Sequence, residues 1–112
     1  MGFFARVGEI FVGRRRAALS HARRLEAMGG LEEATALYAE HGEPADAARL
    51  LALRADAVLD PERKRLLLSQ AASFASGERL REIEAKRARL TLELAAAGSY
   101  SPSRFELGEI AA

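Results

Sequence analysis

Apolar residues recur along this chain at spacings of three and four, which is the spacing of one face of an α-helix. The pattern predicts six helices joined by short turns, over residues 3–12, 15–28, 31–41, 44–59, 61–77 and 78–97. Gly13 weakens the first helix, and later glycines supply the left-handed backbone that ends helices. A short seventh helix would run through Phe105, Leu107 and Ile110, with Ser103 and Glu106 capping its first turn.

Each expected helix has one face that we assign to the core. These residues are Ala18, His21 or Ala22, Leu25, Met28, Leu31, Ala34, Leu37, Tyr38, His41, Ala47, Leu50, Leu51, Ala55, Val58, Leu67, Ala71, Phe74, Leu80, Ile83, Leu90, Leu94 and Ala97. Arg87 occupies the one polar position of the last apolar stripe. Its guanidinium either extends to solvent or pairs with an acid across a hairpin or an oligomer contact.

Composition supports an almost entirely helical chain. The 112 residues include 24 Ala and 16 Leu, against eight Val, Ile and Thr combined, which leaves little material for β-sheet. The length suits one compact domain. We expect an amphipathic helix over 1–13, a helical-hairpin domain over 14–98 and a tail over 99–112 that holds a short helix or begins a further segment. The fold class is therefore all-α, built of short antiparallel helical hairpins.

Self-similarity is the next feature of the chain. A shift of 36 residues aligns Leu31 with Leu67 and Tyr38 with Phe74, so these two aromatic residues should be buried at equivalent places. Residues 31–61 resemble a tetratricopeptide repeat at a series of positions, namely Leu31, Ala34, Thr35, Tyr38, Gly42, Ala47, Leu51 and the closing Leu59-Asp60-Pro61. Residues 61–97 match at Leu67, Phe74 and Gly77. The resemblance implies a tetratricopeptide-like α-solenoid, with a small helical bundle as the alternative, and a scaffold or adaptor that holds a peptide or helix in a groove.

The residues offer little support for catalysis. His21 and His41 are the only histidines, and neither has a second ligand at metal-binding spacing. Cysteine is absent, no serine has a Gly-x-Ser-x-Gly setting, and Gly29-Gly30 lacks the features of a phosphate-binding loop. We therefore expect no enzyme, no metal, no cofactor and no small-molecule substrate.

The N-terminus carries the strongest binding signal. Phe3, Phe4, Val7, Ile10 and Phe11 fall on one helical face, and Arg14, Arg15 and Arg16 follow at once. Together with Arg87, these are the residues that we expect to bind a partner. The apolar stripe has three available surfaces, which are the protein's own hairpins, a second copy or protein partner, and an anionic membrane surface.

Charge argues against general nucleic-acid binding. The net charge is only +1, and residues 31–60 hold seven acids against two Arg. No aromatic residue is interleaved with the arginines to stack on bases. The excess of Arg over Lys is typical of a GC-rich, bacterial genome, and no secretory signal is evident, which favours the cytoplasm. The expected function is a non-catalytic interaction or assembly adaptor, self-association included. The alternative is a membrane-surface or nucleic-acid-associated protein that acts through the N-terminus.

Overall fold

The computed structural model describes the backbone of residues 3–98 and the side chains of residues 13–98. Five helices account for most of this part, namely α1 (Phe3–Ala27), α2 (Leu31–Glu40), α3 (Pro44–Ala57), α4 (Pro61–Phe74) and α5 (Gly77–Ala96). They contain 25, 10, 14, 14 and 20 residues, about three quarters of the chain. No strand occurs within residues 3–98. The all-α prediction is confirmed.

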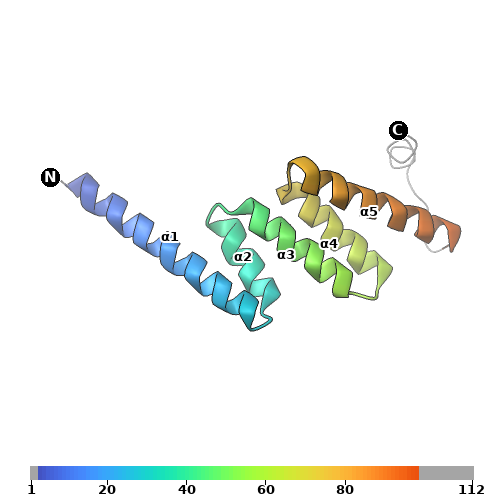
Figure 1. Ribbon diagram of the computed structural model, residues 1–112, viewed down its shortest axis with the longest axis horizontal. Helices are drawn as coiled ribbons and strands as arrows, with labels where there is room; N and C mark the ends of the chain where they lie inside the picture. The colour runs from blue at the N-terminus through green and yellow to red at the C-terminus, as the bar shows by residue number, and fades with distance from the viewer. Residues whose placement is uncertain (1–2, 99–112) are drawn as a thin grey trace.

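Successive helices run antiparallel, and each packs against its neighbours in the chain (Figure 1). The row of helices measures 64 × 30 × 20 Å. Its radius of gyration is 18.0 Å, whereas a compact domain of this length would have a radius near 13 Å. The molecule is therefore elongated, and its stability depends on contacts between adjacent helices.

Two kinds of local chemistry set the helix ends. Gly29 has φ +86°, and this left-handed residue lets the Gly30 N–H donate to the Leu25 carbonyl at 2.7 Å, which closes α1. Asp60 caps α4, because its Oδ1 accepts from the Glu62 N–H at 3.4 Å and Pro61 occupies the first helical position. The turns predicted from Gly29, Asp60 and Pro61 are thus confirmed.

Two apolar clusters meet at α3. We call the first the N-terminal cluster, which joins α1, α2 and α3 through Leu19, Ala22, Ala34, Tyr38, Ala47 and Leu50. The second is the C-terminal cluster, which joins α3, α4 and α5 through Leu51, Ala52, Ala55, Leu67, Leu68, Ala71, Ile83, Leu90 and Leu94. Leu50 and Leu51 point into different clusters. The central helix therefore belongs to both halves of the core.

The predicted interruption near Gly13 is wrong, because α1 runs without a break from Phe3 to Ala27. Glycine inside a helix costs only about 1 kcal/mol relative to alanine, and the residues that follow Gly13 are mostly strong helix formers. A Cβ built at Gly13 would meet no atom within 4 Å, so no close backbone contact requires glycine there.

Most predicted core positions are buried or half-buried, but several are not. His21, Met28, Phe74 and Ala97 are exposed, and Ala22 is the buried member of the pair His21 or Ala22. Met28 is 76% exposed because it lies in the turn after α1. Tyr38 is 3% exposed and Phe74 is 36% exposed, so their predicted equivalence is wrong. Phe74 is the last residue of α4, so no further turn of that helix covers its ring.

Candidate functional site

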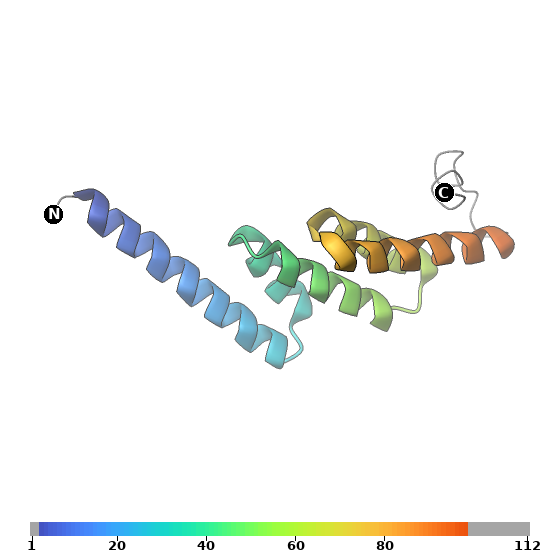
Figure 2. The ribbon, with the colours of Figure 1, turned by 45° about the horizontal axis from the view of Figure 1, so that its top comes forward.

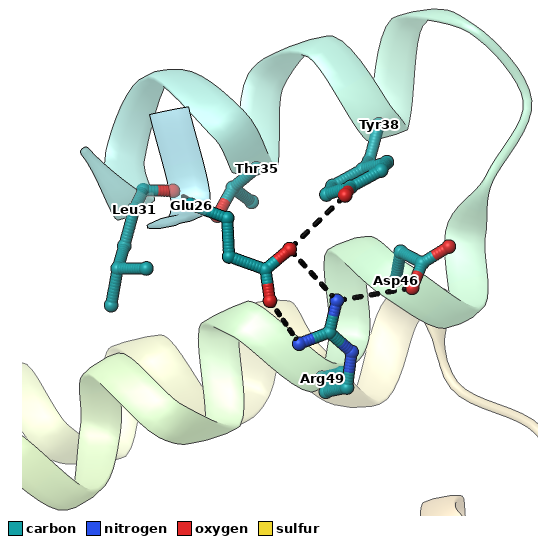
Figure 3. Close-up of polar contacts among 6 residues, drawn as sticks. All are labelled: Glu26, Leu31, Thr35, Tyr38, Asp46 and Arg49. Atoms are coloured by element: carbon teal, nitrogen blue, oxygen red, sulfur yellow. Dashed lines mark hydrogen bonds and ion pairs between the residues drawn. The ribbon is translucent and has the colours of Figure 1, made fainter. Parts of the chain in front are cut away.

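A polar network crosses α1, α2 and α3 on the side of the N-terminal cluster (Figure 3). Arg49 donates to both carboxylate oxygens of Glu26, to Oε1 at 2.5 Å and to Oε2 at 3.1 Å. It also donates to Oδ1 of Asp46 at 3.1 Å. The Tyr38 hydroxyl donates to Glu26 Oε2 at 3.1 Å. Glu26 therefore receives three hydrogen bonds from two other helices.

Local sequence places each member of this network. Asp46 and Arg49 are three residues apart on α3, which puts them on neighbouring positions of the helix surface. Tyr38 has a buried ring on α2, and its hydroxyl needs a polar partner at the edge of the core. Glu26 stands one residue before the end of α1 and supplies that partner. The three helices are thereby fixed to one another at a defined register.

The network favours a charged Glu26 and Arg49 and a neutral Tyr38. The hydrogen bonds from Arg49 lower the pKa of Glu26 below 4.5, against the opposing effect of burial, and the Tyr38 hydroxyl lowers it further. Burial raises the pKa of Tyr38 above 10.0, and the neighbouring Glu26 carboxylate adds to this. The Glu26 hydrogen bonds raise the pKa of Arg49 above its ordinary value. The directions of these pKa shifts are those of a Glu26–Arg49 ion pair beside a neutral Tyr38 phenol. Such an arrangement suits a structural clamp rather than proton transfer.

A second clamp lies at the other end of α2. The Arg15 guanidinium donates to Glu43 Oε1 at 2.6 Å and to the His41 carbonyl at 3.0 Å. Both Arg15 and Glu43 are partly exposed. Arg15 was one of the residues predicted to bind a partner, and the structure engages it with the turn between α2 and α3. The two clamps together attach the segment from Arg15 to Glu26 along the length of α2.

The other predicted binding residues are dispersed. Arg14 and Arg16 are exposed on α1, as are Arg23 and Arg24. Arg87 is half-buried on α5, where its carbonyl accepts from the Thr91 hydroxyl at 2.9 Å. Since α1 and α5 lie at opposite ends of the row (Figure 1), Arg87 does not join the arginine cluster.

The N-terminal apolar stripe falls on backbone that belongs to α1. The side chains of Phe3, Phe4, Val7, Ile10 and Phe11 lie outside the part of the chain whose side chains the structure describes. The predicted tail helix around Phe105, within residues 99–112, likewise lies outside the described residues.

Exposed apolar side chains form a further feature of the surface. Leu59 is 96% exposed and Leu66 is 58% exposed, and Leu53, Phe74 and Leu92 also reach solvent. Leu66 and Phe74 are eight residues apart on α4 and so lie on the same side of that helix. Leu59 precedes the same helix by two residues. The region from Leu59 to Phe74 therefore presents apolar groups outside both core clusters.

Sequence reasoning missed the network around Glu26. The helical pattern predicts Tyr38 as a core aromatic residue but does not identify a hydrogen-bond partner for its hydroxyl. The available signals were the spacing of Asp46 and Arg49 and the need of a buried phenol for a partner. Neither signal could have identified Glu26, because that residue reaches the network only through the antiparallel packing of α1 on α2.

Comparison with protein-family models, with curated proteins and with solved structures finds no match to this chain. Within the described residues, no helix has the length and apolar character needed to cross a membrane. In the same part of the chain, no three His, Asp or Glu side chains come together in a way that would hold a metal ion.

Proposed function

We propose that this chain is a non-catalytic interaction module that binds protein partners through the outer faces of its helices. The observation that carries the proposal is the exposure of large apolar side chains along α4 and the turn before it. Leu59, Leu66 and Phe74 reach solvent there. Apolar side chains grouped on one surface are typical of protein contact sites. An elongated row of helices also offers more outer surface than a compact bundle of the same length.

The resemblance to a tetratricopeptide repeat supports the same function. Ala34, Ala47 and Leu51, which are among the positions that carry it, are all buried between adjacent helices. Gly42 has φ +74° and turns the chain from α2 to α3. These features suit a stacked helical hairpin, the building unit of repeat proteins that act as scaffolds.

Affinity capture with quantitative mass spectrometry tests this proposal. We expect Leu59→Ser combined with Leu66→Ser to lower partner recovery several-fold, because two exposed apolar groups are lost. Leu92→Ser is the matched control, since it removes an exposed leucine from a different helix, α5. Circular dichroism would establish that the variants remain folded. Equal recovery with all three proteins would contradict the proposed surface.

A second candidate function rests on α1. Arg14, Arg16, Arg23 and Arg24 are exposed, and residues 13–25 contain no acid. Such a helix attracts anionic surfaces through charge, whether a lipid bilayer or a nucleic acid. Cosedimentation with vesicles containing phosphatidylserine, at about 50 mM and about 500 mM salt, tests the lipid, and a DNA duplex serves as the second probe. Binding that falls steeply with salt and with Arg23→Glu would favour this candidate.

A further inference from the structure

The outward side of α2 is acidic. The exposed residues of this helix are Glu32, Glu33, Ala36 and Glu40. At about 100° per residue, these positions lie within about 100° of one another around the helix axis. Neither Lys nor Arg occurs between residues 25 and 48 of the sequence. One side of α2 therefore carries negative charge with no base beside it along the chain.

The outward side of α1 is basic. This helix lies at one end of the row and its start extends past α2, so much of its surface faces away from the other described helices (Figures 1 and 2). Arg16, Ser20, Arg23 and Arg24 are exposed, and they too fall within about 100° around the helix axis. Residues 13–25 contain no acid. This side of α1 therefore carries positive charge.

Neither set of charges is engaged inside the molecule. Within residues 13–98, no hydrogen bond or ion pair involves the side chains of these three acids or these three arginines. A hollow also opens at the start of the acidic side, lined by Gly29, Gly30, Leu31, Glu32, Glu33 and Ala36. Its apolar and glycine surface suits the hydrocarbon stem of an arginine, and its two carboxylates suit the guanidinium. The acidic side is thus shaped and charged to accept a basic side chain.

The two sides match in spacing. Each has a charged residue, a small residue four positions later and a further charged residue four positions after that. These positions are Arg16, Ser20 and Arg24 on α1 and Glu32, Ala36 and Glu40 on α2. A second charge adjoins one end of each series, Arg23 on α1 and Glu33 on α2. The extra base is near the C-terminal end of its series and the extra acid near the N-terminal end of the other, so the two series match when the helices run antiparallel.

We propose that the basic side of α1 in one copy of the chain packs antiparallel on the acidic side of α2 in a second copy. Ser20 of the first copy then faces Ala36 of the second in the middle of the contact, and these small side chains let the two helices approach closely. Arg16 comes level with Glu40 of the second copy at one end of the contact. Two arginines and two glutamates meet at the other end.

The charges at that other end fall on the two edges of the contact. A rotation of about 100° per residue places Arg23 along the same edge as Glu32 of the second copy. Arg24 and Glu33 share the opposite edge, and each pair is about 1.5 Å from level along the axis. The hollow at the start of α2 lies at this end and accommodates the arginine stems. Parallel packing would leave Arg23 and Glu33 at opposite ends, so the charges select the antiparallel orientation.

Charge complementarity identifies the partner as a second copy. The acidic side requires a helix with bases at matching intervals and a small residue between them, and this chain presents such a helix on its own surface. An anionic bilayer or a nucleic acid would be attracted to α1 and repelled by the acidic side of α2. The inference rests on the proposed interaction module and deepens it by naming one partner, at a surface separate from Leu59 and Leu66.

The contact should be weak and sensitive to salt. Exposed ion pairs contribute little individually and are screened at high ionic strength. We expect association between about 100 µM and about 1 mM protein in about 20 mM salt, and its loss in about 500 mM salt. Each copy contributes a different side to the contact, so one copy can bind two others. The average mass should therefore rise with protein concentration.

Charge exchange tests the contact by sedimentation equilibrium of the full chain in about 20 mM salt. Arg16→Glu with Arg23→Glu reverses the net charge of the α1 side, and Glu32→Arg with Glu40→Arg reverses that of the α2 side. Each double variant should weaken association about tenfold, because the two sides then carry like charge. The four changes in one chain restore opposite charges and the original net charge. They should return the association constant to within about threefold of the original.

A matched control separates this contact from a general effect of net charge. Arg79→Glu with Arg81→Glu makes the same change in net charge at exposed positions of α5, and should leave association unchanged. Circular dichroism establishes that each variant remains helical. An original chain that stays monomeric at about 1 mM, or four changes that restore nothing, would overturn the proposal. A defect confined to the α1 variant would also overturn it, and would assign α1 to an anionic surface instead.

Cysteine cross-linking tests the register, because the chain has no cysteine of its own. A mixture of Ser20→Cys and Ala36→Cys chains, oxidised with copper phenanthroline, should form a mixed disulfide, since the two positions face each other. Ser20→Cys mixed with Ser73→Cys, an exposed position of α4, should not. Equal yields from the two mixtures would overturn the proposal. None of these variants alters Leu59 or Leu66, so partner capture through that surface would stand or fall separately.

Discussion

The two apolar clusters of this molecule are held together in different ways. The N-terminal cluster has six buried residues, three of them alanines, and is completed by the hydrogen bonds among Glu26, Tyr38, Asp46 and Arg49. The C-terminal cluster has nine buried apolar residues, of which six are Leu or Ile. An ion pair at 3.4 Å between Lys86 and Asp56 links α5 to α3, with both side chains well exposed. Charged hydrogen bonds thus help to hold the N-terminal half of the row together, whereas the C-terminal half depends mainly on the packing of large apolar side chains.

This difference shows two ways in which a short row of helices can maintain one defined packing arrangement. Small side chains such as Ala22, Ala34 and Ala47 allow close packing but restrict helix register weakly. A bidentate contact between Arg49 and Glu26 supplies that restriction, because it requires a defined geometry. Bulky leucines in the C-terminal cluster achieve the same through shape. Substitutions should therefore destabilise the N-terminal cluster mainly by removing charged hydrogen bonds, and the C-terminal cluster mainly by removing apolar packing.

The largest expected contrast is between Tyr38 and Phe74. Tyr38→Ala should lower the free energy of unfolding by about 3 to 5 kcal/mol, because it empties an enclosed site. Phe74→Ala should cost only about 1 to 2 kcal/mol, because the ring is partly in water already. Urea denaturation of both variants measures the difference. Equal losses would mean that the two aromatic residues occupy equivalent environments after all.

Truncation of a leucine in either cluster should destabilise mainly the half of the molecule that contains that cluster. Leu50→Ala in the N-terminal cluster and Leu68→Ala in the C-terminal cluster should each cost about 2 to 5 kcal/mol. Because contacts run between adjacent helices, we expect faster amide exchange mainly in α1 and α2 for the first variant, and in α4 and α5 for the second. Hydrogen exchange resolved by segment is the measurement. A uniform increase in both variants would show that the row unfolds as one unit.

Removal of the Glu26 charge should have a smaller effect. Glu26→Gln weakens the contacts with Arg49 and should cost about 1 to 2 kcal/mol, at the low end because both side chains are partly exposed. Asp56→Asn is the control for an exposed ion pair and should cost less than about 0.5 kcal/mol. Thermal unfolding of the two variants in low salt compares them. Equal losses of stability in the two variants would show that the Glu26 network contributes no more than an exposed ion pair.

The smallest expected effect is the pH dependence of the same network. Glu26 has a lowered pKa, so its stabilisation is present above pH 4.5 and is lost as the pH falls through the folded-state value. Tyr38 has a raised pKa, so its contribution is present below pH 10.0 and is lost as the pH rises through the folded-state value. The stability gap between the original chain and Glu26→Gln should therefore shrink from pH 7 to about pH 3.5. A gap of constant size would contradict the assigned charge state.

Much of the fold could be read from local patterns. The helices around Tyr38, Leu50 and Leu67 follow the three-and-four spacing, and the turns at Gly29 and Asp60 follow from backbone chemistry within a few residues. The error at Gly13 arose because a local preference of about 1 kcal/mol is small compared with the rest of a 25-residue helix. The candidate site was less predictable, since Glu26 and Arg49 are 23 residues apart.

The sequence alone determined the helical class, the cap at Asp60 and the buried faces that include Ala34 and Leu50. These features depend on hydrogen bonds and side-chain spacing within one or two turns of the chain, so no distant contact is needed to infer them. Only the tertiary structure decided that Glu26 meets Arg49, that Phe74 reaches solvent and that the start of α1 projects from the row. Each of these depends on where an adjacent helix ends and how far it covers its neighbour, which is a property of packing between helices rather than of any one segment.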